Sequence, residues 1–561
     1  MTLQLPLASL LLPLLGIVIV LLANGRVTVR QLTWMNMLLL LLAAGAALLP
    51  RWGWPLRTPS VDWLGIGLRS SDLAMEWSAG RDLMMVVVLL LGAGGIAAYG
   101  LPVAAGAKSG TLSVLGLLFV VTGSCVTIGA VNGLVAVAGV GMAGLGGLLI
   151  ELSSVPSDRG TTVGGIMPLV AGSLTLAAAT MWDATLLTTT PVWALGCLLL
   201  LCSGPLRIGR GRVPALLQTL ALVLGLPTLG GWLLVHSMTT TPGIWSPTAF
   251  VACSLGGILL LVGGAVWAVT ATRLSQIVAG QWTAQLGLVG LALGGRGPAL
   301  ALLIHATWST VLLGWAVSAL EQAAGTAQIA DLPPFTTPLR RVALIYGVAA
   351  ASVAGAPLLA GYLLHAQLLA RLPGALVAVV FAAHALLALA LIPPLAACIR
   401  RPAYAGVQHN SEPGSMPALL GALVLVLGSV WDIVQLLLLE PGRIVPQTII
   451  AGGLRICSAL LLLALANRRL RQTEAPPVFA GGEPLDKEPG WALPWSGLRA
   501  VLAPNVLDAF QAVLHSSEQV LTRMATTAQP LTRLLARRYY LSLVLAVVIV
   551  VLLAVASGSG P

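Results

Sequence analysis

Three histidines lie inside long apolar stretches of this 561-residue chain, where a group that gains and loses protons is unusual. His305 falls about two turns inside one stretch, His384 lies near the middle of another, and His365 lies close to the end of a third. An imidazole titrates near neutral pH, so such residues could pass protons across a membrane. A structural hydrogen bond is the alternative reading, and it stays open for all three.

Asp432 and Arg455 form a second candidate site. They lie on consecutive apolar stretches at similar distances from the stretch ends, and a helix rises about 1.5 Å per residue, so both should reach similar depth. An unpaired charge is costly in hydrocarbon. The sequence therefore predicts a structural ion pair without a role in transport.

Other signatures of catalysis are missing from the sequence. The six cysteines have no metal-ligand spacing, and no phosphate-binding loop, dinucleotide fingerprint or iron-sulfur cysteine run occurs. We therefore expect no catalytic residue, cofactor or metal in this chain. Redox chemistry, if it is associated with the chain, is expected in a partner protein.

The elements that would position these residues are membrane-spanning helices. Hydrophobic residues make up 58% of the chain and charged residues 8%, which is typical of a membrane protein. A spanning helix needs about 20 apolar residues, and continuous rather than alternating runs indicate helices. We predict an all-α polytopic membrane protein with about sixteen spans, at residues 5–23, 33–49, 83–99, 111–129, 131–150, 163–180, 190–203, 214–236, 248–270, 276–294, 299–319, 341–362, 373–397, 417–438, 447–466 and 540–557.

Glycine-rich stretches occur inside several spans, as at 139–149 and 286–295. Small residues let membrane helices approach closely, so these stretches should be helix contacts. Pro357 and the pair Pro393 and Pro394 interrupt two other spans, which leaves broken helices lining an ion path as the alternative.

The net charge of +11 is dispersed over many loops, which argues against nucleic-acid binding. Arginines concentrate in alternate loops, and cytoplasmic loops are the ones that collect basic residues. We therefore expect a multi-pass protein of the bacterial inner membrane with both termini outside. The loop at 50–82, whose four arginines are offset by acidic residues, would lie outside too.

The C-terminal part has a different organisation. Residues 1–110 should form N-terminal helices and an outside loop, and residues 401–466 additional helices. Residues 467–539 begin with a charged, Pro- and Gly-rich linker, followed over 503–529 by an amphipathic run expected along the cytoplasmic face. Residues 540–561 hold the final transmembrane helix.

Three segments resemble the antiporter-like membrane subunits of respiratory complex I, a family shared with membrane hydrogenases and Mrp antiporters. AGAPLLAGYLLHAQLL (354–369) is similar to the family's AG-x-PP-F-x-GF-x-SK-x-x-IL segment. HATWSTVLLGWAVSAL (305–320) is similar to its HA-x-x-KALLF helix, and TATRLSQIVAGQWTAQLG (270–287) to its D-x-KR-x-x-AYS-x-x-Q-x-G helix. The predicted span count and the outside N-terminus fit the subunit-5 type.

The resemblance implies two inverted five-helix repeats, at 111–236 and 248–400, and a lateral helix in the 467–539 segment that braces neighbouring subunits. It also implies a protonatable channel in each repeat, but the titratable residues are replaced. In the second repeat, the family's lysines or basic pair are replaced by Ser309, Ser275, Gln276 and His365, and in the first its W-E pair falls on Gly139 and Val140. Ser, Gln and Val do not titrate at a working pH, so the proton relay is removed or rerouted.

Two classes of function follow. The first is a membrane-arm subunit of a redox-driven, proton-translocating complex of the NADH:quinone oxidoreductase type, whose partners are other antiporter-like subunits and hydrophilic redox subunits. Its role would be mainly structural, with a reduced proton path through His305 and His384, and His365, Ser309 and Ser275 as further candidates. The second is a subunit of an Mrp-type antiporter or proton-coupled uptake system, or an independent secondary transporter.

Overall fold

The computed structural model describes residues 5–23, 27–49, 56–57, 75–77, 81–100, 108–131, 133–154, scattered positions between 172 and 204, and residues 216–240, 245, 247–295, 297–329, 332, 339–356 and 359–399. Several predictions lie outside these residues: the ion pair of Asp432 and Arg455, the amphipathic segment 503–529, every span beyond residue 399, and the span 163–180 apart from one position.

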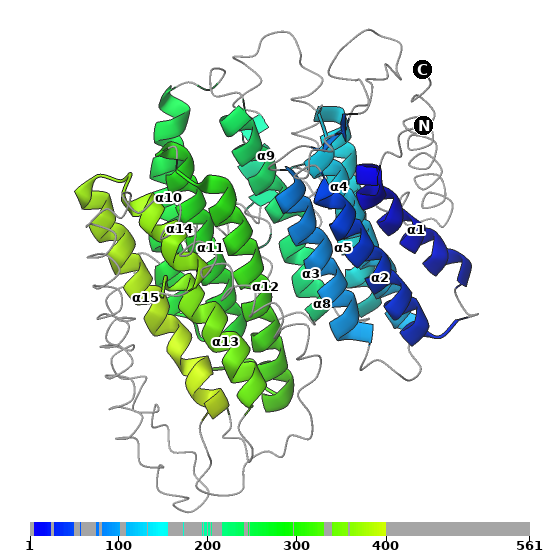
Figure 1. Ribbon diagram of the computed structural model, residues 1–561. Helices are drawn as coiled ribbons and strands as arrows, with labels where there is room; N and C mark the ends of the chain where they lie inside the picture. The colour runs from blue at the N-terminus through cyan, green and yellow to red at the C-terminus, as the bar shows by residue number, and fades with distance from the viewer. Residues whose placement is uncertain are drawn as a thin grey trace, which may run out of the picture. The chain divides into compact units, whose positions relative to one another are not determined.

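The described residues are almost entirely helical (Figure 1). Six candidate membrane spans lie among them, at Thr111–Gly129, Leu222–Thr239, Pro247–Val269, Leu274–Gly294, Ala299–Ala324 and Gly374–Ile392. The chain is therefore a multi-pass helical membrane protein, as predicted, while the total of about sixteen spans stays a prediction. The elements are η1 (Leu5–Leu7), α1 (Ala8–Ala23), α2 (Val29–Ala47), β1 (Leu56–Arg57), β2 (Glu76–Trp77), α3 (Arg81–Gly100), α4 (Lys108–Gly129), α5 (Gly133–Ser154), α8 (Leu216–Leu224), α9 (Leu226–Thr240), α10 (Pro247–Val269), α11 (Leu274–Gly294), α12 (Ala299–Ala324), α13 (Arg340–Val353), α14 (Ala360–Leu369) and α15 (Gly374–Ile399).

The chain divides into two compact units. The first unit contains η1, α1 to α5, α9 and the antiparallel strand pair β1 and β2, and the second contains α10 to α15. Residues of α8 belong to both. In the second unit, α11 lies between α10 and α12, and its side chains are buried along most of its length (Figure 1).

Glycines bring α4 against α5 and α10 against α11 with backbone in contact. A Cβ added at Gly116 would lie 2.7 Å from the Gly146 carbonyl oxygen, and one at Gly257 would lie 2.6 Å from the Leu291 nitrogen. Neither helix can yield at such a contact, because the atoms involved are backbone atoms. The prediction that the glycine-rich stretches are helix contacts is confirmed for these two pairs.

The same glycine spacing occurs in both helix pairs. Each contact glycine of α4 and α5 has a counterpart 141 positions later in α10 and α11. The first set is Gly116, Gly123, Gly139 and Gly146, and the second is Gly257, Gly264, Gly280 and Gly287. One pattern of close backbone approach therefore builds a helix pair in each unit.

Three spans differ in continuity from their predictions. The predicted span 214–236 is divided at Gly225 into α8 and α9. The predicted span 341–362 is interrupted: α13 ends at Val353, and Gly355 has φ of 72°, a left-handed conformation that ends a helix. The chain then resumes as α14. In contrast, α15 continues through Pro393 and Pro394, which we had expected to interrupt it. A proline is tolerated in a membrane helix where its neighbours satisfy the freed carbonyl.

Candidate functional site

The three histidines singled out from the sequence lie together in the second unit, and we call them the histidine row. His305 comes from α12, His365 from α14 and His384 from α15. The ring centroids of His305 and His365 are 5.9 Å apart in an edge-on arrangement, and those of His365 and His384 are 4.6 Å apart. All three are buried, with exposed fractions of 3%, 0% and 4%. His365 is therefore the middle member of a continuous imidazole row.

The break between α13 and α14 positions the first member of this row. The His305 Nε2 atom lies 2.9 Å from the Ser352 hydroxyl in the last turn of α13. That hydroxyl also accepts a hydrogen bond from the Gly361 backbone nitrogen, at 3.3 Å, in the first turn of α14. A Cβ on Gly361 would lie 2.9 Å from His305 Nε2, so glycine is required for α14 to start beside the ring. Sequence reasoning did not single out Ser352, although it lies three residues before the helix-ending glycine.

The hydrogen bonds of His384 define its tautomer. Its Nδ1 lies 2.8 Å from the Val380 carbonyl oxygen, one turn earlier in α15. A carbonyl only accepts, so Nδ1 carries a hydrogen. In a neutral ring, Nε2 of His384 is therefore the acceptor nitrogen. The row thus ends on an imidazole whose tautomer is set by its own helix.

The serines and glutamine at the family's lysine and basic-pair positions have local roles or lie apart. The Ser309 hydroxyl donates to the His305 carbonyl oxygen at 2.6 Å, within its own helix. Gln276 caps the start of α11, where its side-chain oxygen accepts from the backbone nitrogens of Thr272 and Arg273. Ser275 is buried in the same first turn, ten residues before Gln285 and so about 15 Å from it along the axis. Ser275 is therefore separated by about that distance from the α13 break, which Gln285 contacts through the Val353 carbonyl.

Two buried glutamines on α11 add hydrogen-bonding capacity to the second unit. The Gln285 amide donates to the Val353 carbonyl at the α13 break, at 3.4 Å. Gln281, one turn away, is fully buried, and neither side-chain polar atom has a protein partner among the described residues. Buried amides are normally satisfied, and water is the usual partner where protein is not. These side chains could order water beside the break.

The electrostatic setting of the row is neutral. Among the fully buried residues described in the second unit, none is an Asp, Glu, Lys or Arg. One carboxylate oxygen of Glu321 is buried, but Glu321 lies sixteen residues from His305 on α12, about 24 Å along the axis, so it does not balance a proton on His305. The described part of the chain also holds no group of His, Cys, Asp and Glu arranged to bind a metal.

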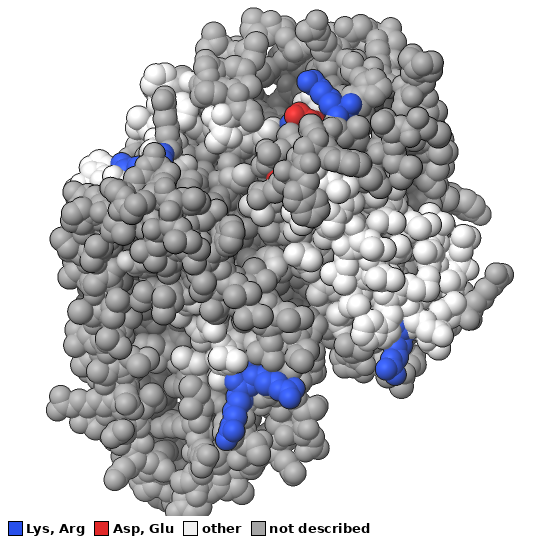
Figure 2. Space-filling model, in the orientation of Figure 1, with Lys and Arg blue, Asp and Glu red and all other residues white. Residues whose placement is uncertain are grey.

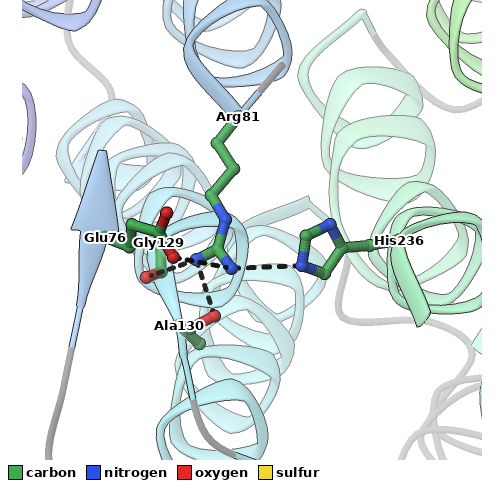
Figure 3. Close-up of polar contacts among 5 residues, drawn as sticks. All are labelled: Glu76, Arg81, Gly129, Ala130 and His236. Carbon is green, nitrogen blue, oxygen red and sulfur yellow. Dashed lines mark hydrogen bonds and ion pairs between the residues drawn. The ribbon is translucent and has the colours of Figure 1, made fainter. Parts of the chain in front are cut away.

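The first unit has a different polar site, the arginine cluster, formed by Glu76, Arg81, Gly129, Ala130 and His236 (Figure 3). Arg81 Nη1 donates to the Gly129 and Ala130 carbonyl oxygens at 3.0 and 2.9 Å. Its Nη2 lies 3.1 Å from His236 Nε2 and 3.4 Å from the Glu76 carboxylate. Arg81 thereby joins β2, the end of α4 and the end of α9.

Arg81 precedes the predicted span 83–99 and is buried, with 7% of its surface exposed. Burial lowers the pKa of its guanidinium, Glu76 opposes that shift, and Arg57 adds to it. An arginine still keeps its proton at any physiological pH. A positive charge at the last carbonyls of α4 also interacts favourably with that helix end.

Sequence reasoning counted Arg81 only as one of four arginines in the outside loop and did not single out His236. One signal was available: an arginine at the first position of an apolar helix opposes the helix dipole and needs another partner. The strand that carries Glu76 is itself anchored, since the Trp77 indole donates to the Ser9 hydroxyl at 2.8 Å. On the face drawn in Figure 2, the basic side chains of the described residues lie in separate places, in keeping with the dispersed charge of the sequence.

Comparison with known proteins identifies the fold. No protein family and no curated protein matches the sequence. A chain of the Mrp complex from Dietzia sp. DQ12-45-1b superposes with a TM-score of 0.61 and 17% identity over 94% of this chain and 63% of that chain. A chain of the membrane-bound sulfane sulfur reductase (MBS), an archaeal respiratory membrane complex, superposes with a TM-score of 0.63 and 12% identity over 82% of this chain and 99% of that chain.

These identities show a shared fold and no more. The chain spans less than two thirds of the length of the Mrp chain. It is a multi-pass membrane protein with the fold of chains found in an Mrp complex and in a respiratory membrane complex.

Proposed function

We propose that this chain is an antiporter-like subunit, of the subunit-5 type, in the membrane arm of a multi-subunit, redox-driven, proton-translocating complex of the NADH:quinone oxidoreductase type. The observation that carries the proposal is its fold, shared with chains of two multi-subunit membrane complexes, one of them respiratory. The three sequence segments that resemble the complex I family support it independently. Its partners would be other antiporter-like subunits and hydrophilic redox subunits.

The role of the chain in that complex is mainly structural, with a reduced proton path. In the second unit the path consists of the histidine row. Two protonated imidazoles 4.6 Å apart would repel each other by roughly 4 kcal/mol at an effective dielectric constant near 20. His365 and His384 would therefore share at most one proton beyond their neutral forms, and the row would pass protons singly.

The direction of the path follows from the helices. His305 is six residues inside α12, about 9 Å from its start, and His384 is ten residues inside α15, about 15 Å from its start. With the N-terminus outside, both helices would start at the outer surface, so the row leads from the outer side toward the membrane centre. Ser309 and Ser275 contribute at most to ordering water.

Two inverted five-helix repeats, at 111–236 and 248–400, would underlie this architecture. The glycine spacing shared by α4 and α5 with α10 and α11 supports the proposal, because it recurs after a constant 141 positions. The proposed setting is the bacterial inner membrane, with both termini outside.

One observation favours a second candidate function, a subunit of an Mrp-type cation and proton antiporter. The Mrp chain covers 94% of this chain, against 82% for the MBS chain. A proton-coupled uptake system or an independent carrier is a weaker alternative. A carrier would be expected to hold charged groups at the membrane centre, whereas the described part of the second unit has histidines there.

Affinity purification of the tagged full-length chain in mild detergent, with mass spectrometry of the co-eluting chains, tests the proposal. A redox complex predicts other antiporter-like chains together with hydrophilic redox subunits. Antiporter subunits without redox subunits would support the Mrp alternative. Elution of the chain alone, with ion transport by that chain in liposomes, would contradict both.

A further inference from the structure

The arginine cluster contains a titratable residue on which the proposed function does not depend. We propose that His236 is a proton-binding site that controls this cluster: a proton on its Nε2 releases Arg81, and acid thereby loosens the contact between β2, α4 and α9. The ligand of the site is the proton itself.

The argument begins with donors and acceptors. Arg81 Nη2 and His236 Nε2 are 3.1 Å apart. Every nitrogen of a guanidinium donates and none accepts, so His236 Nε2 must be the acceptor in this contact. His236 is therefore neutral here, with its ring hydrogen on Nδ1. A proton added to Nε2 would set two N–H donors against each other.

Charge adds to the effect of the lost hydrogen bond. Protonation would place an imidazolium beside a guanidinium in a partly buried site. Among the described residues, the charged groups near them include Glu76, Arg57 and Asp82. Glu76 is the acidic partner of Arg81, at 3.4 Å, and Arg57 adds a further positive charge. Asp82 accepts from the backbone nitrogen of Leu83 at the start of α3. The single carboxylate of Glu76 that is paired with Arg81 cannot balance two cations.

The neighbour of His236 on its own helix favours the protonated ring. Trp232 stacks on His236 with ring centroids 5.1 Å apart and an angle of 14° between the planes. An indole face attracts a cation. The imidazolium would therefore remain on Trp232, and Arg81 is the residue that must move.

The displacement would act on three elements, because Arg81 holds the last carbonyls of α4 and, through Glu76, strand β2. A bridge between Met75 and Ala130 joins the same segments. Residues 75–77 and 129–131 should therefore lose protection together. The direction of the linkage is fixed: the contact needs a neutral His236, so its stabilisation is present at high pH and is lost on acidification.

Hydrogen exchange of the full-length chain in lipid nanodiscs tests this inference, at about pH 8 and about pH 5, with labelling times scaled for the intrinsic exchange rate. Amides of residues 75–77 and 129–131 are expected to exchange about tenfold faster at the lower pH. Amides of α10 to α12 serve as the internal reference. None of these measurements involves transport, so their outcome is independent of the proposed function.

Two variants mimic the neutral and the protonated forms of His236. His236→Gln keeps a neutral acceptor near the Nε2 position and should remove the pH dependence, with slow exchange at both pH values. His236→Lys carries a permanent charge and should give fast exchange at both. Thr239→Ala, on the same helix end, is the matched control and should retain the wild-type response, because Thr239 bonds carbonyls of its own helix.

The wild-type protein alone can overturn the inference. Equal protection of residues 75–77 and 129–131 at the two pH values would do so, even if neither His236 variant folds. An acid-induced loss of protection that persists in His236→Gln would assign the effect to another group and also contradict it.

Discussion

The helix pair α4 and α5 in the first unit and the pair α10 and α11 in the second have the same backbone contacts but different polar contents. In both, glycines at equal spacing let backbone meet backbone. In α4 the buried hydroxyls of Thr122, Ser124 and Thr127 donate to carbonyls one turn earlier. Ser124 and Thr127 also lie 3.2 and 3.4 Å from the carbonyl oxygens of Leu224 in α8 and Ala136 in α5, so these hydroxyls serve both their own helix and its neighbours.

The second unit has amides where the first has apolar residues. Val140 of α5 corresponds, at the offset of 141, to Gln281 of α11, and both are fully buried. Position 144 is a glycine, whereas its counterpart is Gln285. The comparison teaches that the close-packed glycines are enough to build the helix pair. Within these two helix pairs, buried amide side chains are an addition found in α11, in the unit that holds the histidine row, and not in α4 or α5.

The largest expected effect concerns the shared glycines. A Cβ at Gly264 would collide with the Ala284 nitrogen, and one at Gly146 with the Gly116 oxygen. We expect Gly264→Ala and Gly146→Ala each to destabilise the protein by about 3 kcal/mol or to prevent folding, because backbone must separate. Thermal unfolding in detergent measures the change.

The adjacent glycines provide matched controls. Gly263 and Gly147 have open space where a Cβ would lie, so Gly263→Ala and Gly147→Ala should leave the melting temperature nearly unchanged or raise it slightly. If substitution of a contact glycine and of its open neighbour changed the melting temperature equally, close packing would not be the feature that the two units share.

The second prediction compares the stability that is lost when a polar site is removed from each unit. Arg81→Met would leave the Gly129 and Ala130 carbonyls and Glu76 without their cation, and should cost about 3 kcal/mol of stability. His384→Leu, in the histidine row, should cost about 1 kcal/mol, because it removes the ring together with its bond to its own helix. Chemical denaturation of the full chain compares the two. A larger loss for His384→Leu would reverse the assignment of structural and functional sites.

The smallest expected effect comes from exchanging one pair of residues. Val140→Gln places an amide in the apolar interface of the first unit and should destabilise it by about 2 kcal/mol. Gln281→Val removes an amide with no protein partner among the described residues and should change stability by less than about 1 kcal/mol in either direction. A large loss for Gln281→Val, measured by thermal unfolding, would show that this glutamine is needed for the fold.

Much of the helical architecture could be predicted from hydropathy. The predicted spans 83–99, 111–129 and 276–294 correspond to α3, α4 and α11 with ends shifted by three residues or fewer. Apolar length is decisive for such helices, because a bilayer satisfies no backbone group. An interruption of this span was expected from Pro357, but its start after Val353 was not predicted. It depends on the left-handed conformation of Gly355, and hydropathy does not report backbone dihedrals.

The candidate site was predicted in part. Sequence reasoning named all three histidines but gave no reason to place them together, because the row depends on where α14 starts. The role of Gln276 as a helix cap was missed, since only the family comparison was applied to it. The arginine cluster was missed because its members come from residues 76 to 236, and spacing along the chain does not reveal such contacts.

The central proposal is that the fold of an antiporter-like subunit is kept here, while the proton path in the described part of the second unit is reduced to the histidine row. The most direct test is proton pumping by the purified complex in proteoliposomes, measured with a pH-sensitive dye beside electron transfer, for the wild type and for His305→Ala combined with His384→Leu. We predict nearly unchanged electron transfer and retention of most of the pumping. Complete loss of pumping in this variant would contradict the claim, because the row would then be a main proton path of the complex.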